Sequence, residues 1–163
     1  MSKDELLQWV RDIVGEPAAE LRQRPGGGRH QAWDVDVDGR PRWFLRMDHG
    51  SPAAHEHYTL RRESDIYRAV HESGIPSPAV LGVHSTLEAV LLERIDGTAA
   101  FAGLDVDSQT SIIDDFTPIL ARLHAATPPR IESLGSAITI RDAVVAELDI
   151  WESRLESTGN RSE

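Results

Sequence analysis

The stretch Arg24–Asp48 constrains the fold most, because it combines a glycine cluster with two apolar segments joined by a turn. The cluster has three members, Gly26, Gly27 and Gly28. Glycines permit positive φ angles and leave the backbone amides open to a ligand. Apolar and polar residues then alternate in part over 32–37, Asp38-Gly39 is a turn signal, and a second apolar segment ends at Arg46. This pattern predicts a β-hairpin behind a glycine-rich loop.

A long helix is predicted next, from about 53 to 73, because no glycine or proline interrupts this segment and a Gly-Ile-Pro stop signal follows it. Glu63 shares a face of this helix with apolar residues, and a carboxylate on an inward face needs a cationic partner. We expect that partner to be Arg46, at the end of the preceding strand. The alternative is a surface pairing of Glu63 with its helix neighbours Tyr67 and Arg62.

The remaining elements are predicted from the spacing of apolar residues. Apolar residues at every second position indicate a strand, and those at every third and fourth position indicate a helix. Three short strands are expected at 20–23, 79–83 and 89–95. Three more helices are expected at about 2–14, 107–127 and 139–158, the second with a kink or break at Pro118.

Charge and composition exclude several classes of protein. The net charge of −10 argues against a nucleic-acid partner, although six arginines against three aspartates give Arg22–Arg46 a local charge of +3. No apolar stretch is long enough to span a membrane, and no signal-peptide pattern opens the chain. The absence of cysteine excludes disulfides, thiolate nucleophiles and cysteine metal sites. We therefore expect a cytoplasmic protein without membrane partners.

Two acidic or histidine-rich patterns suggest metal sites, but both fail on inspection. Residues 34–39 read Asp-x-Asp-x-Asp-Gly, as in an EF-hand loop, yet Leu45 stands at the twelfth position, where calcium needs a bidentate Glu. A solvent-facing strand followed by a turn is the better interpretation. In His55-Glu56-His57 the two histidines would point to different faces of a helix. We expect no metal ligand in this sequence.

Four patterns together resemble the aminoglycoside phosphotransferase and choline kinase-like family. They are the glycine cluster before the hairpin, the Leu-Arg strand end at Arg46, the Gly-x-Pro-x-Pro link at 74–78 and the Leu-Leu-Glu-x-x-x-Gly pattern at 91–97. Protein kinases instead have a third glycine where Gln31 stands and a lysine where Arg46 stands. The resemblance covers roughly residues 19–157.

The resemblance implies an α+β fold with a protein kinase-like N-terminal lobe, an antiparallel sheet of about five strands with one long helix against it. An N-terminal helix would occupy 1–18, the nucleotide-binding lobe 19–98, and the helical start of a truncated C-terminal lobe 99–163. Residues 120–124 fit the family's Leu-x-x-Leu-His helix, in which His124 would have a structural role.

The resemblance also implies that ATP is the cofactor and assigns its contacts. The glycine loop would cover the phosphates, and Arg46 would contact them while it pairs with the helix Glu63. The Glu93 C=O and the Ile95 N–H would bind the adenine edge, with Leu92 behind it. Eight residues are thus expected to bind the nucleotide: Gly26, Gly27, Gly28, Arg46, Glu63, Leu92, Glu93 and Ile95.

The family's catalytic loop, His-Gly-Asp-x-x-x-x-Asn, has no counterpart here, because none of the seven histidines is followed two residues later by Asp. No catalytic residue is assigned, and Mg²⁺ is expected only with a complete C-terminal lobe. We expect this chain to be inactive in phosphate transfer and to self-associate through an exposed lobe face. The sequence does not define the acceptor substrate. The alternative is a non-catalytic nucleotide- or protein-binding module derived from the same fold.

Overall fold

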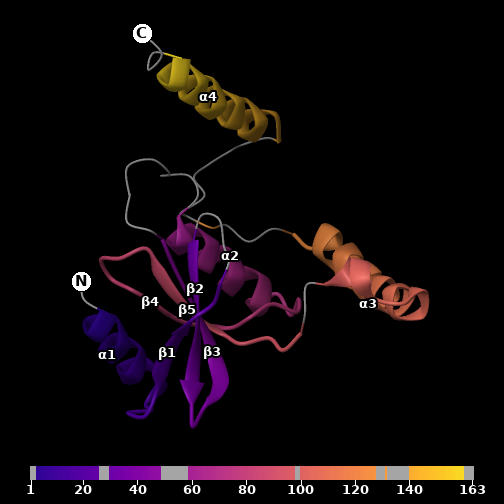
Figure 1. The fold of residues 1–163 in the computed structure, drawn as a ribbon. Coiled ribbons are helices and arrows are strands. Elements are labelled where there is room, and N and C mark those ends of the chain that lie inside the picture. Colours follow the sequence, from indigo (N-terminus) through magenta and orange to yellow (C-terminus); the bar gives the residue numbers. More distant parts are fainter. Residues whose placement is uncertain are drawn as a thin grey trace. The chain divides into compact units, whose positions relative to one another are not determined.

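The computed structural model describes residues 3–25, 30–48, 59–97, 100–127, 131 and 140–159. The chain divides into two units, Met1–Pro129 and Arg130–Glu163 (Figure 1). The first unit contains a five-stranded sheet with helices α1, α2 and α3, and the described part of the second contains helix α4, Ile140–Gly159. The expected α+β fold is confirmed.

The sheet is antiparallel throughout and has the strand order β1-β2-β3-β5-β4. Its strands are β1 Glu20–Gln23, β2 His30–Val37, β3 Arg40–Asp48, β4 Val80–Val83 and β5 Ala89–Glu93. Asp38 and Gly39 join β2 to β3 with φ angles of 51° and 71°, the pair of positive values that a type I′ turn requires. The predicted hairpin is confirmed, and its second strand, β3, lies in the middle of the sheet.

Alternation along the strands gives the sheet two different faces. On one face, Val35, Leu45 and Leu91 are fully buried and pack with Val10 of α1, Lys3–Val14. On the other face, Val90 and Leu92 of β5 and Phe44 of β3 pack with Leu60 and Tyr67 of α2, Leu60–Glu72. Figure 1 shows α1 and α2 beside the sheet. Glu63 is therefore carried by the helix that faces Phe44 and Leu92.

Helix α3, Val106–Ala125, continues through Pro118 as a single helix, so the expected break is absent. Asp105 caps its N-terminus by accepting from the Ser108 N–H at 2.8 Å. Large apolar residues along α3 are about half exposed, namely Ile112, Ile113 and Phe116. Among the described residues, no helix combines the length and the apolar character needed to cross a membrane.

Gly82 on β4 marks a close approach between the sheet and α1. A Cβ atom there would overlap Ile13 Cδ1 and lie 3.4 Å from Trp9 Cζ2. We expect Gly82→Ala to lower the free energy of unfolding by about 1–2 kcal/mol, because Ile13 must shift. Urea unfolding would measure this. The control Gly103→Ala, where nothing lies within 4 Å of the added carbon, should change stability by less than ~0.5 kcal/mol.

Candidate functional site

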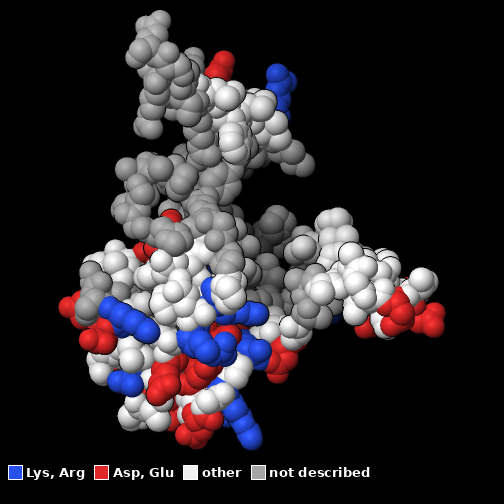
Figure 2. Space-filling model, viewed as in Figure 1, with Lys and Arg blue, Asp and Glu red and all other residues white. Residues whose placement is uncertain are grey.

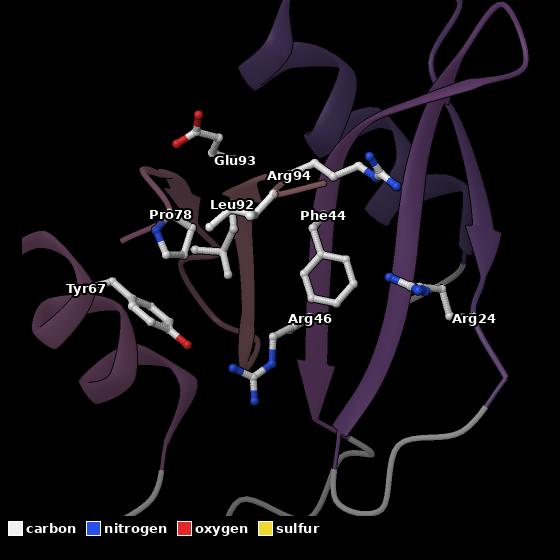
Figure 3. A pocket seen from close by; sticks show the side chains of 9 residues that line it. Arg24, Phe44, Arg46, Tyr67, Pro78, Leu92, Glu93 and Arg94 are labelled. Atoms are coloured by element: carbon white, nitrogen blue, oxygen red, sulfur yellow. The ribbon is translucent and has the colours of Figure 1, made fainter. Parts of the chain in front are cut away.

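A cavity of about 310 Å³ lies on the face of the sheet that α2 packs against (Figure 3). Strands β3 and β5, helix α2, and the segments at 24, 78 and 94–95 supply its walls. It is lined by Arg24, Phe44, Arg46, Tyr67, Pro78, Leu92, Glu93, Arg94 and Ile95. The cavity thus combines apolar side chains with three arginines, whereas the Glu93 carboxylate points away from Phe44 and Arg46 (Figure 3).

Arg46 and Glu63 form an ion pair at this cavity, as the sequence predicts. Their side chains are 22% and 31% exposed, so water screens the pair only in part. The Tyr67 hydroxyl also donates to Glu63 Oε1, at 2.7 Å. The alternative partner Tyr67 and the preferred partner Arg46 therefore share one carboxylate oxygen. Arg46 also contacts His30, at the start of β2, with 3.1 Å between Arg46 Nη2 and His30 Nδ1.

Arg46 reaches the cavity because alternate residues of β3 point the same way. Phe44 and Arg46 face the α2 side, whereas the intervening Leu45 is buried against α1. Glu63 lies in the first turn of α2, one turn before Tyr67. The pair thus depends on strand alternation, on helical periodicity and on the position of α2 against β3.

The pKa of the Tyr67 hydroxyl reflects this environment. Burial raises its pKa, and its hydrogen bond to Glu63 adds to the effect, whereas Arg46 acts in the opposite direction. We expect Glu63→Gln to lower the Tyr67 pKa without restoring the ordinary value, because the burial remains. Phenolate absorbance in a Tyr58→Phe background would show this, and an unchanged pKa would mean that burial alone causes the shift.

The raised pKa of Tyr67 also sets the sign of its effect on stability. The unfolded chain loses the phenol proton near pH 10, before the folded chain does. The contribution of Tyr67 to stability is therefore complete below about pH 10 and is lost as the pH rises toward the folded pKa. Urea unfolding at alkaline pH should show a smaller loss in Tyr67→Phe than in the parent chain.

The predicted hinge residues lie along the end of β5. Leu92 is 3% exposed and packs into the apolar cluster beneath the cavity. Glu93 pairs with Ala79 through its backbone N–H at 2.8 Å and its carboxylate at 3.1 Å, and Ile95 is exposed beyond the strand end. The cavity therefore brings together Arg46, Leu92, Glu93 and Ile95, with Glu63 bound to Arg46. The predicted residues Gly26, Gly27 and Gly28 lie outside the described part of the chain.

Asp34 and Asp36 are buried, and the expectation that this strand would carry them into solvent was wrong. Arg22 covers both, with Nε 2.7 Å from Asp36 and Nη2 3.0 Å from Asp34. Arg24 and Arg94 approach Asp34 to 3.9 and 3.8 Å through their Nε atoms. Figure 2 accordingly shows basic and acidic side chains intermixed over the sheet. The local positive charge of this region is thus partly balanced within it.

Five residues that line the cavity were not among the nucleotide-binding residues expected from the sequence: Arg24, Phe44, Tyr67, Pro78 and Arg94. A usable signal existed for three of them. Phe44 lies two residues before Arg46 on the same strand face, Tyr67 lies one helical turn after Glu63, and Arg94 lies within the predicted hinge. Arg24 gave no such signal, because its approach to Phe44, 5.9 Å from guanidinium carbon to ring centroid, depends on the pairing of β1.

The described residues contain no group of three or more His, Asp or Glu side chains that could hold a metal ion. Asp34 and Asp36 are engaged with Arg22, and Leu45, at the twelfth position of the calcium-like pattern, is fully buried. The pattern His55-Glu56-His57 lies outside the described residues.

No family model and no curated protein matches the sequence. Solved structures do match. The streptomycin–ATP–APH(2'')-IIa ternary complex has a TM-score of 0.63 at 16% identity, over 98% of this chain and 53% of that chain. The ADP-bound aminoglycoside phosphotransferase APH(2'')-Ib gives 0.63 at 15% identity, over 97% and 52%. Aminoglycoside phosphotransferase APH(4)-Ia gives 0.54 at 17% identity, over 77% and 40%.

This chain has the fold of an aminoglycoside phosphotransferase. It spans about half the length of the two structures that match nearly all of it. At 15–17% identity the similarity shows a common fold. The predicted resemblance to kinase-like phosphotransferases is thereby confirmed at the level of the fold.

Proposed function

We propose that this chain is the nucleotide-binding lobe of an ATP-dependent small-molecule phosphotransferase. The observation that carries the proposal is the cavity itself, which joins the Arg46–Glu63 ion pair to the predicted hinge residues on one face of the sheet. Two of the matching structures are complexes with ATP or ADP. The nucleotide-binding lobe would comprise 19–98, with 1–18 as an N-terminal helix and 99–163 as the start of a second lobe.

Each part of the cavity has a task in this proposal. The Glu93 C=O and the Ile95 N–H would bind the adenine edge, while Leu92 and Phe44 offer it apolar surface. Arg46 would bind phosphate oxygens through its planar fork of donors, and Glu63 would hold that fork in place. The amides of the glycines at 26–28 would cover the phosphates.

Phosphate transfer itself needs groups that this sequence does not offer. An acceptor-orienting Asp and Mg²⁺ ligands position and neutralise the reacting phosphate in kinases. The sequence has no His-x-Asp, and the described residues have no cluster that fits a metal ion, so Mg²⁺ is not assigned to this chain. We therefore expect nucleotide binding without transfer from these 163 residues.

A second candidate function is a non-catalytic module that binds a nucleotide or a protein. The half-exposed apolar residues of α3 favour it, because an apolar stripe on a helix is normally covered. Such a stripe also supports self-association, which sedimentation of the purified chain would detect. Phosphate transfer by a longer chain that contains this sequence would exclude the non-catalytic function.

The proposal is tested by calorimetry with ATP on two variants of one hinge residue. Ile95→Pro removes the N–H that would bind adenine, whereas Ile95→Ala keeps it. We expect the first to weaken binding about tenfold and the second to change it less than about twofold. Absence of ATP binding in the parent chain, or equal affinities in both variants, would overturn the assignment.

A further inference from the structure

Glu88, at the turn into β5, contacts both elements that carry the ion pair. Its backbone C=O accepts from the Asp48 N–H at 2.8 Å, at the end of β3. Its carboxylate Oε2 accepts from the Leu60 N–H at 2.8 Å and from the Arg61 N–H at 3.4 Å, at the start of α2. One half-buried residue thus joins the strand of Arg46 to the helix of Glu63.

The first turn of α2 depends on Glu88 for half of its hydrogen bonds. The N–H groups of the first three helical residues have no carbonyl partner within the helix, and the fourth donates to the C=O of the N-cap residue. In α2, the Arg62 N–H donates to Thr59 Oγ1 at 3.1 Å and the Glu63 N–H donates to the Thr59 C=O at 3.0 Å. The other two, of Leu60 and Arg61, donate to Glu88 from outside the helix. A carboxylate at this end also complements the helix dipole.

The loop before Glu88 also forms hydrogen bonds with the N-terminal turn of α2. The Arg61 guanidinium donates to the C=O groups of His84 and Ser85, at 2.9 and 3.1 Å. His84 Nδ1 in turn lies 3.3 and 3.2 Å from the N–H groups of Thr86 and Leu87, which donate to it. The β4–β5 loop is therefore an internally bonded anchor for α2.

We propose that Glu88 is a positioning residue that fixes α2 against β3 so that Glu63 meets Arg46. Glu63 follows Leu60 by about one turn, so any sliding of the helix at Glu88 is passed directly to the pair. One residue of slip is about 1.5 Å, enough to break a hydrogen bond. The inference rests on the proposed function and deepens it, because Arg46 would bind phosphate there in the orientation that Glu63 gives it.

The first test needs no nucleotide. The shift in urea midpoint caused by Glu63→Ala is measured in the parent chain and in the Glu88→Ala background. If Glu88 holds α2 in place, the shift should fall to less than about half in that background, because coupled residues are not additive. In the Glu88→Gln background, which keeps a carbonyl acceptor, Glu63→Ala should still cause most of the shift in urea midpoint. Glu72→Ala, an exposed Glu in the last turn of α2, is the control background and should leave it unchanged.

The second test uses ATP affinity. Glu88→Ala and Glu63→Ala should each weaken binding about tenfold, and the double variant should be no more than about twofold weaker than either. Full additivity in both tests would overturn the role of Glu88 while leaving nucleotide binding intact. Coupling in the urea test without ATP binding by the parent chain would instead sustain the positioning role and overturn the proposed function.

Discussion

Arg46→Ala is expected to weaken ATP binding about 10- to 100-fold, as measured by calorimetry. Hydrogen bonds between ions contribute about 1.5–3 kcal/mol, and each 1.4 kcal/mol is a factor of ten in affinity. The substitution also leaves the Glu63 carboxylate beside the cavity without its guanidinium partner, so that it would repel phosphate. Adenosine, which has no phosphate, should bind almost equally well before and after the change.

Two variants sharpen this expectation. Arg46→Lys keeps the charge but loses the planar fork, and should lie between the parent chain and Arg46→Ala. Arg42→Ala removes an exposed arginine from the same strand and should change affinity less than about twofold. A loss in Arg42→Ala as large as that in Arg46→Ala would show that net charge, rather than the cavity, attracts ATP.

Asp34→Ala is expected to lower the free energy of unfolding by about 2–3 kcal/mol in urea titrations. Removing one partner of a buried ion pair costs about 3–5 kcal/mol, because it strands the opposite charge. That figure is reduced here because Arg22 and Arg24 are about half exposed and can be hydrated. Arg94, at 24% exposure, has less access to water, but Asp96 remains as its partner after the substitution.

The matched control is Asp96, which pairs with the same arginine from a position that is 87% exposed. Asp96→Ala should cost less than ~1 kcal/mol, since surface ion pairs contribute little. Equal costs for the two aspartates would mean that Asp34 contributes through something other than its burial between arginines.

The elements of this fold could be predicted because their signals are local. The signals for the Asp38-Gly39 turn, for the partial alternation over 32–37 and for the helix stop at 74–76 each need only a few neighbouring residues. The Arg46–Glu63 pair also followed, since an inward carboxylate and an inward cation on successive elements have few other partners. The eight-residue nucleotide assignment as a whole remains a prediction.

The burial of Asp34 and Asp36 could not be predicted in the same way. Alternation shows that the two aspartates share a face, but not what covers that face. The cover is Arg22 and Arg24, and these reach the aspartates only because β1 pairs with β2 in one particular register, Arg22 opposite Asp34. Such a register is a long-range property, and the four residues of β1 specify it weakly on their own.

The central position of β3 has a consequence for the order in which this sheet opens. β3 is hydrogen-bonded on both sides, to β2 and to β5, whereas β1 and β4 are edge strands of four residues each. Local opening spreads from weakly paired edges, so amide hydrogens of β3 should be among the last to exchange with deuterium. We therefore expect slow exchange in the strand that carries Phe44 and Arg46, and faster exchange in β1, which precedes Arg24, another residue of the cavity lining. We therefore expect the Arg24 side of the cavity to open before the side formed by β3.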